Sequence, residues 1–344
     1  MAGRFRGRHL ADPVDRVASV MRPATGGTPP VTELRPIAFD RPAALRLARR
    51  AIFARNDPES ETEQFVSAVE REVESGVAAG VLRFDGDRAV GMALWEPPTA
   101  VGATVQLLYS IEGWQGSDEY RRFFLDVRGI AGPVAFAPGR LAGLTGAEED
   151  LLMQSMGFAR FVRSEMRLPP DSPTPAVPDP TLSGLRESRA SDLASLARLH
   201  ELAYRGHFDR YLFLTDPDPA RNAELELEGI VGGKWGEFLP WASWVFEASE
   251  GIRAAALVVR AAYGPLIVDV MVDPALRGRG LGRAVLSATI RGLRGREESA
   301  IILNVTDGNR AAVRLYERLG FVRSLGPSHG WYSVERVPVP PGAG

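Results

Sequence analysis

The chain has 344 residues, more than one ordinary domain of roughly 100–200 residues, and this length favours two domains. Hydrophobic residues make up 45% and charged residues 24%, as in soluble globular proteins, which argues against global disorder. The formal net charge of -2 predicts no bulk attraction to nucleic acid or to an anionic membrane, and the lack of cysteine excludes disulfides, thiolate metal sites and cysteine nucleophiles.

The N-terminal segment, residues 1–32, is rich in Arg, Gly and Pro and cannot bury enough apolar surface to order itself. We expect a flexible tail there, without the apolar core of a signal peptide. The longest apolar stretch, 254–272, is interrupted by Arg260, Pro265 and Asp269, so no membrane span is predicted. The four histidines are never four residues apart, which argues against a histidine metal site. We expect a cytoplasmic protein without a metal.

A proline-rich segment, residues 169–182, divides the chain into two halves of similar length. Proline-rich sequences form semi-rigid, extended linkers. The sequence therefore predicts one domain over 33–168 and a second over 183–338.

The two halves look like a repeat. Each opens with a short strand, continues with a helix rich in Ala, Leu and Arg, and runs into a pair of strands. The expected helices cover 43–54 and 192–204, with Ser191 as the N-cap of the second, and the expected strand pairs cover 81–84 with 89–95 and 243–248 with 254–259. Each half then ends in a helix, a Gly-Phe pair and a strand, with residues 152–158 matching 315–321. We expect duplicated α/β domains.

The second half contains a strand, a glycine-rich turn and a helix in direct succession. The strand covers 267–272, the turn carries Gly278, Gly280 and Gly282, and an apolar-periodic helix follows. This arrangement points free backbone N–H groups at an anion, and glycine lets the backbone approach it closely. The sequence therefore predicts a phosphate-rich ligand at the turn, with Arg277, Arg279 and Arg283 adding positive charge.

Two nucleotide motifs do not fit this turn. The dinucleotide fingerprint is G-x-G-x-x-G followed by an acidic residue about 20 positions later, whereas this turn reads G-x-G-x-G. A P-loop requires a lysine that is absent here.

The run Arg277-x-x-Gly280-x-Gly282 instead resembles the acyl-CoA pyrophosphate loop of the GNAT superfamily of N-acyltransferases. The next block, a strand over 302–305 and then Asn309-x-x-Ala312-x-x-Leu315-Tyr316-x-x-Leu319-Gly320-Phe321, resembles the same superfamily in order and spacing. The resemblance implies two tandem GNAT-like α/β domains, each with a mixed, mostly antiparallel twisted sheet flanked by helices.

The resemblance also implies roles for individual residues. The main chain of Val270, Met271 and Val272 would bind the pantetheine arm of acetyl-CoA. The N–H groups of the loop would hold the pyrophosphate, and the cofactor-binding residues there are Arg277, Gly278, Arg279, Gly280, Leu281, Gly282 and Arg283. Asn304, Asn309 and Ala312 complete the cofactor site. Tyr316 would be the general acid that protonates the departing thiolate, because its hydroxyl is a donor at neutral pH; the alternative is helix-to-sheet packing.

The general base is less sharply defined by the sequence. Asp269 is the best candidate by position, since it lies on the strand before the loop; the alternative is a carboxylate that caps a backbone group. Asp209, Asp216 and Glu237 in the expected acceptor region are further candidates. The aromatic residues between 204 and 244 either line an acceptor pocket or form the core under two helices.

The corresponding part of the first half lacks the glycine motif. Asp118 and Glu119 occupy the region where a phosphate would require N–H groups, and Met153, which cannot donate a proton, matches Tyr316. The first half therefore looks like a degenerate copy with a structural role.

These observations predict an N-acyltransferase that moves an acetyl or another small acyl group from acyl-CoA to a primary amine by direct attack in a ternary complex, because no cysteine can carry the acyl group. The acceptor would be a small-molecule or peptide amine, with no nucleic acid or membrane partner, and the protein a monomer or homodimer. The alternative is an acyl-CoA-binding sensor with little turnover.

Overall fold

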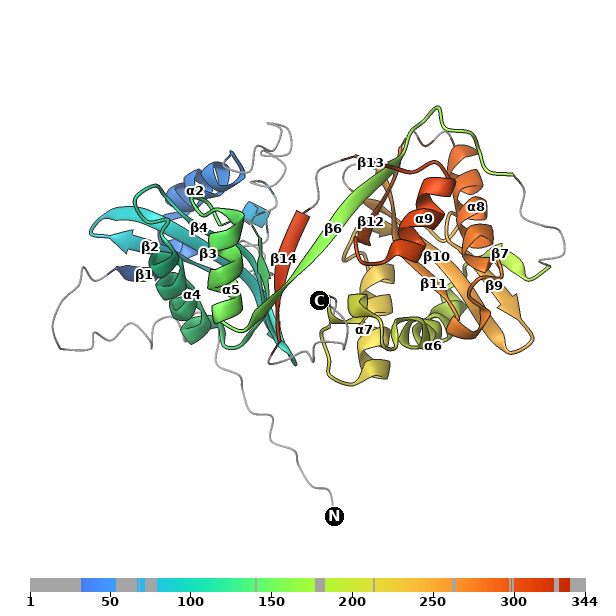
Figure 1. Cartoon of the computed structure of the whole chain (residues 1–344), viewed down its shortest axis with the longest axis horizontal. Coiled ribbons are helices and arrows are strands. Elements are labelled where there is room, and N and C mark those ends of the chain that lie inside the picture. Colours follow the sequence, from blue (N-terminus) through green and yellow to red (C-terminus); the bar gives the residue numbers. More distant parts are fainter. Residues whose placement is uncertain are drawn as a thin grey trace, which may run out of the picture. The chain divides into compact units, whose positions relative to one another are not determined.

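The computed structural model describes residues 32–53, 67, 69–71, 79–139, 141–176, 183–212, 214–261, 264–296, 298, 300–324 and 328–334 (Figure 1). Residues 1–31 of the expected tail and 177–182 of the expected linker lie outside these ranges. The described residues form two compact units. The first comprises those up to Arg160 together with 330–334, and the second runs from Phe161 to His329.

The first unit is built on a sheet of six strands in the order β1-β2-β3-β4-β5-β14. The strands are β1 (Glu33–Pro36), β2 (Ala79–Asp85), β3 (Arg88–Thr99), β4 (Gly102–Ser110), β5 (Val134–Pro138) and β14 (Ser328–Ser333). Only β4 and β5 pair in parallel. The C-terminal strand β14 joins this sheet through antiparallel pairing with β5, with Trp331 opposite Ala137.

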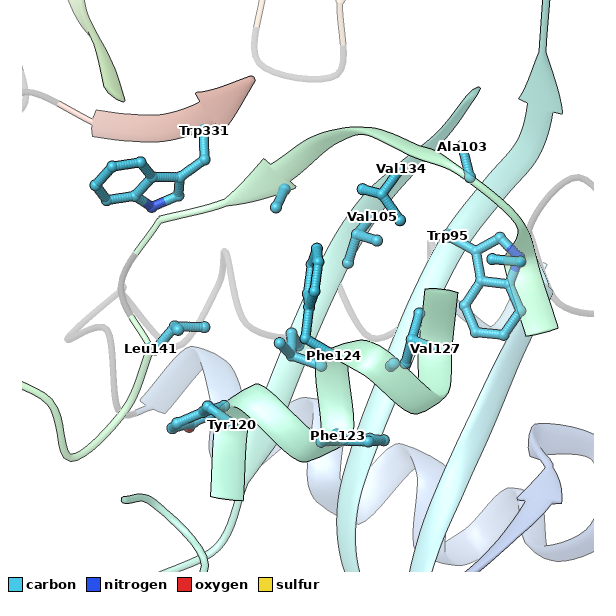
Figure 2. Packing of buried hydrophobic residues seen from close by; sticks show 14 of the residues in the cluster. Trp95, Ala103, Val105, Tyr120, Phe123, Phe124, Val127, Val134, Leu141 and Trp331 are labelled. Atoms are coloured by element: carbon cyan, nitrogen blue, oxygen red, sulfur yellow. The ribbon is translucent and has the colours of Figure 1, made fainter. Parts of the chain in front are cut away.

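Helices cover both faces of this sheet because apolar side chains of the strands alternate in direction. Val81, Ala93 and Val105 pack on one face with α4 (Ser117–Ala131) and α5 (Gly146–Ser155). Figure 2 shows Tyr120, Phe123, Phe124 and Val127 of α4 lying against the strands, with Trp331 of β14 at the edge of the same cluster. The opposite face carries Leu82, Met92, Leu94 and Leu107 and is covered by α2 (Arg41–Phe53), which follows the 3-10 turn η1 (Ile37–Asp40).

The second unit has the strand order β6-β12-β11-β10-β9-β7, with β13 added beside β6 and β8 beside β10. The strands are β6 (Phe158–Leu168), β7 (Leu185–Glu187), β8 (Glu237–Phe238), β9 (Trp244–Ala248), β10 (Gly251–Ala261), β11 (Gly264–Val272), β12 (Ile301–Thr306) and β13 (Val322–Arg323). All pairs are antiparallel except β11 with β12. This mixed, mostly antiparallel architecture flanked by helices confirms the predicted fold class.

Alternation again divides the core of the second unit into two layers. Ala254, Ala256 and Val258 of β10 face α8 (Leu281–Arg294) and α9 (Arg310–Arg318). Ala255, Leu257 and Val259 face α6 (Leu193–Tyr204) and α7 (Pro219–Val231). Two 3-10 turns, η3 (Phe208–Tyr211) and η4 (Pro274–Leu276), follow α6 and β11.

The start of α6 differs from the sequence prediction. Ser191 is not the N-cap, because a 3-10 turn, η2 (Ala190–Asp192), precedes the helix and Asp192 occupies the cap position. The Asp192 carboxylate accepts the backbone N–H of Arg189 at 2.8 Å and pairs with the guanidinium of Arg186. None of the helices in the described ranges has the length and apolar character needed to cross a membrane.

Candidate active site

The candidate site lies where two parallel strands separate. β11 and β12 are paired only at Leu266 with Ile302 and at Ile267 with Leu303, although β11 continues to Val272 and β12 to Thr306. Beyond these pairs, the two strands border a cavity of about 850 Å³. A strand edge without a neighbour offers its backbone N–H and C=O groups to a ligand.

An irregularity in β11 places Asp269 on this cavity. Leu257 pairs with Asp269 but Val258 pairs with Ile267, so the register shifts and Val268 has no opposite partner. Such bulges redirect side chains. Asp269 lines the cavity and is only 6% exposed over the whole residue.

Asp269 is the centre of a buried polar cluster with α6. The hydroxyl of Tyr204 donates a 2.6 Å hydrogen bond to Asp269 Oδ1. His200 stacks on Tyr204 with ring centroids 4.4 Å apart, and its Nε2 lies 3.8 Å from Asp269 Oδ2. Within the described ranges, Oδ2 is buried and accepts no hydrogen bond.

Burial dominates the electrostatics of this cluster, because a charged group loses solvation in the interior. It raises the pKa of Asp269 to about 7, opposed by the hydrogen bond from Tyr204 and assisted by the charge of Asp209. It lowers the pKa of His200 to about 4, so the imidazole is neutral near pH 7. A carboxyl group that titrates near pH 7 is suited to accept a proton during a reaction.

The glycine-rich turn forms another wall of the cavity. Gly278 and Gly280 have φ angles of +78° and +84°, which favour glycine, and Gly280 is the N-cap of α8. The first bond of the helix runs from the Ala284 N–H to the Gly280 carbonyl at 2.9 Å. The three preceding amides, of residues 281–283, are therefore available at the positive end of the helix dipole.

Close packing holds this helix against the strands. A Cβ atom at Gly282 would lie 3.3 Å from Val272 Cγ2 and 3.4 Å from Leu315 Cδ2. Arg277 does not point freely outward, because its Nη2 donates a 2.6 Å hydrogen bond to the carbonyl of Ala203 at the end of α6. The turn, β11, α6 and α9 are thus fixed to one another around the cavity.

The residues expected to bind a cofactor mostly gather on this cavity. Its lining includes Val270, Val272, Arg277, Gly278, Gly280, Leu281, Gly282, Arg283, Asn304, Asn309 and Ala312. Met271 and Arg279 do not line it: the Met271 side chain packs in the core beneath α6 and α7, and Arg279 is exposed. Asn309 Oδ1 accepts the Ala312 N–H at 3.2 Å and so caps α9.

Tyr316 lies on α9 and also lines the cavity, at 7% exposure. Its ring packs at 6.0 Å from Phe321, which belongs to the core of the second unit. Burial, together with the charges of Asp269 and Asp209, raises the pKa of Tyr316 well above its ordinary value. The hydroxyl therefore stays protonated at neutral pH, as a proton donor requires.

Several cavity residues were not predicted from the sequence. Arg163, on β6, lines the cavity, and its Nη2 donates to the carbonyl of Asn304 at 3.2 Å. Tyr204 and His207, at and after the end of α6, line the same cavity. No local signal marks Arg163, since it lies before the proline-rich segment, in sequence assigned to the other half. Tyr204 had no role of its own predicted from the sequence, because it was one of several aromatic residues between 204 and 244.

Of the three other candidates for the general base, only some lie at the cavity. Asp209 lines the cavity, whereas Asp216 and Glu237 are not among its lining residues. Most of the aromatic segment is core: Trp235 and Phe238 pack with α6 and α7, and Trp241 and Trp244 pack on the α8 face. The side chains of Phe208 and Tyr211, and residue Phe213, lie outside the described part.

Comparison with known proteins agrees with this geometry. The model of the acetyltransferase (GNAT) family matches residues 215–321, which include the glycine turn, β12 and α9. The chain is 30% identical over 307 residues to a mycothiol acetyltransferase of Thermobispora bispora, covering 85% of this chain and 95% of the relative. A second mycothiol acetyltransferase, from Thermomonospora curvata, is 31% identical over 180 residues, or 50% of this chain and 56% of the relative. The chain belongs to the GNAT acetyltransferase family.

Solved structures share the fold of this GNAT acetyltransferase. A GCN5-related N-acetyltransferase from Sphaerobacter thermophilus has a TM-score of 0.59 and 18% identity, covering 90% of this chain and 97% of its own. A tandem GNAT protein from the clavulanic acid biosynthesis pathway has a TM-score of 0.54 and 16% identity, covering 88% and 98%. The resemblance stated from the motifs is confirmed, and so is the assignment as an acetyltransferase.

The first unit of this GNAT acetyltransferase has different chemistry at the corresponding helix. Asp118 and Glu119 lie in the first turn of α4, and Glu119 pairs at 3.0 Å with Arg83, which is 2% exposed. The residue that matches Tyr316, Met153, is buried in the apolar core. The carboxylate at this helix start thus neutralises a buried arginine within the unit.

Proposed function

We propose that this GNAT acetyltransferase transfers an acetyl or other small acyl group from acyl-CoA to a primary amine by direct attack in a ternary complex. The observation that carries the proposal is the convergence on one cavity of the α8 N-terminus, Tyr316 and Asp269. These three features supply an anion site, a proton donor and a proton acceptor. The first unit, with a buried ion pair at its helix start, would serve as a structural partner.

The residues around the glycine turn fit a CoA group. The amides of residues 281–283 precede the first helical hydrogen bond and would bind the pyrophosphate, and Arg283 would add positive charge. No atom lies within 4 Å of the Cβ position at Gly278 or Gly280, so there is space beside the turn. The unpaired edge of β11 from Val270 to Val272 would hydrogen-bond the pantetheine arm.

The acidic and basic groups divide the proton transfers. Asp269 Oδ2 would take one proton from the acceptor ammonium, which frees the lone pair that attacks the thioester carbon. A C–N bond forms and the C–S bond breaks. Tyr316 would donate its proton to the sulfur and recover one from the new amide nitrogen, so that one proton in total returns to solvent through Asp269. Holding both reactants in one cavity supplies much of the rate.

Calorimetric titration of acetyl-CoA tests the cofactor site. We expect one binding site per chain and no binding to Gly280→Glu, because the new carboxylate would meet the pyrophosphate. Gly113→Glu is a matched control: Gly113 has a φ of +87° and, like Gly280, an open Cβ position, but it lies in the first unit. Two sites per chain would contradict the structural role of the first unit, and no binding to the native chain would refute the proposal.

Thiol release tests turnover. The chain has no cysteine, so a thiol reagent sees only the CoA product unless the acceptor carries a thiol. Relatives of the chain are named mycothiol acetyltransferases, so the deacetylated form of mycothiol is the first acceptor to assay, with mass spectrometry of the amide product. We expect Tyr316→Phe to lower kcat by roughly 10²-fold or more and to leave acetyl-CoA affinity nearly intact, while Tyr109→Phe changes neither. If the native chain binds acetyl-CoA but shows no turnover, the alternative function, an acyl-CoA-binding sensor, would be favoured.

A further inference from the structure

A second carboxylate, Asp209, lies on the wall of the same cavity. It belongs to η3, whose N-cap is His207. The His207 ring fixes its position: Nδ1 accepts the backbone N–H of Asp209 at 3.2 Å and lies 3.6 Å from Asp209 Oδ2. The Asp209 side chain is 15% exposed.

Two carboxylate oxygens on this cavity have no hydrogen-bond donor among the described residues. They are Asp209 Oδ1 and Asp269 Oδ2, both buried from solvent. The Asp269 side chain is only 4% exposed. A buried acceptor without a donor is unfavourable, so a ligand that brings donors is favoured at such a place. An ammonium group brings three N–H donors and a positive charge.

The charge of Asp209 affects three ionisable side chains near the cavity. It raises the pKa of Asp269 and also that of Tyr204 and Tyr316. The titratable and charged groups near Asp269 come from five elements of the second unit. They are His200 and Tyr204 of α6, Asp209 of η3, Glu226 of α7, Tyr316 of α9 and Arg163 of β6.

We propose that Asp209 is the binding group for the ammonium form of the acceptor and selects amines that are protonated in solution over neutral amines. This inference rests on the proposed function. Asp209 would hold the cation while Asp269 Oδ2 takes one of its protons, so the two carboxylates have separate tasks. Removing Asp209 should therefore weaken acceptor binding more than it slows the chemical step.

The test uses two probes of the same shape. Ethylamine is a cation at pH 8, and O-methylhydroxylamine, in which oxygen replaces one CH₂ group, is neutral. Each is titrated by ligand-observed NMR into the full chain saturated with CoA, and each is then assayed as an acceptor of acetyl groups. The variants are Asp209→Asn and, as a matched control, Asp171→Asn, because Asp171 is exposed and is not among the residues that line the cavity.

We expect Asp209→Asn to weaken ethylamine binding about tenfold or more, since a hydrogen bond to a charged group contributes roughly 1.5–3 kcal/mol, and to change O-methylhydroxylamine binding less than twofold. Asp171→Asn should bind both probes like the native chain. Equal binding of ethylamine to all three proteins, no ethylamine binding to the native chain, or equal weakening of both probes would overturn the proposal. Ethylamine binding that depends on Asp209 without any acetyl transfer would instead refute the proposed function and leave the ammonium site standing.

Discussion

The hydroxyl of Tyr204, at the last residue of α6, donates a 2.6 Å hydrogen bond to Oδ1 of Asp269 on β11. Because this oxygen is occupied, Oδ2 is the atom of Asp269 left to accept a proton. The bond also favours the ionised carboxylate, against the effect of burial.

Tyr204→Phe should therefore move the pH dependence of catalysis. The proposed base must be ionised, so kcat/KM of the native enzyme should rise with pH through a midpoint near 7, the pKa of Asp269. Loss of the hydrogen bond raises that pKa, and the midpoint should move up by roughly one pH unit. The acceptor should be an amine that stays protonated over this pH range, such as ethylamine, so that only the enzyme titrates. An unmoved midpoint would remove Tyr204 and Asp269 from the proposed mechanism.

Asp269→Asn should stabilise the folded protein and lower its turnover. Burial raises the pKa of the Asp269 carboxyl in the folded state from 3.8 to about 7. The folded state therefore binds a proton that the unfolded state has released between pH 3.8 and 7, and the free energy of unfolding falls as the pH rises through this range. The variant avoids this loss, and its advantage in free energy of unfolding should grow from pH 4 to pH 8 by on the order of 3–4 kcal/mol. Urea denaturation at both pH values measures it. Turnover should fall by roughly 10²-fold; an advantage independent of pH would contradict the raised pKa.

His200 should make the fold sensitive to acid. Burial lowers the pKa of His200 from 6.5 to about 4, so its contribution to stability is complete above pH 6.5 and is lost as pH falls through 4. His200→Phe keeps a ring against Tyr204 and removes the titration. Between pH 7.5 and 4 the variant should lose less stability than the native chain, by on the order of 3 kcal/mol. Parallel stability curves for the two proteins would show that His200 does not titrate in this way.

Glu119→Gln should destabilise the first unit without affecting the cofactor site. It leaves the buried guanidinium of Arg83 without its closest counter-charge, which costs about 3 kcal/mol when one partner of a buried pair is removed. Asp118→Asn, an exposed neighbour in the same helical turn, should cost less than about 0.5 kcal/mol. Thermal unfolding and acetyl-CoA titration of both variants provide the measurement. Weaker acetyl-CoA binding in Glu119→Gln would mean that the first unit influences the site.

Local sequence was sufficient where a local rule determines the structure. Gly278 and Gly280 permit the positive φ angles of the turn, and the apolar periodicity after them favours a helix, so the strand, turn and helix of the site were predicted in place. The apolar residues 254–259 were likewise predicted as a strand, and they lie in β10. The family followed from these motifs and from Asn309 to Phe321.

The tertiary structure decided everything that depends on contacts between distant segments. The separation of β11 from β12 and the bulge at Val268 cannot be read from either strand alone, because register is set by the partner. The hydrogen bond from Tyr204 to Asp269 spans 65 residues, and Arg163 reaches the cavity from β6, before the proline-rich segment. The pairing of β14 with β5 places a strand that follows the second unit in the sheet of the first unit. The raised pKa of Asp269 arises from burial, which sequence neighbours do not determine.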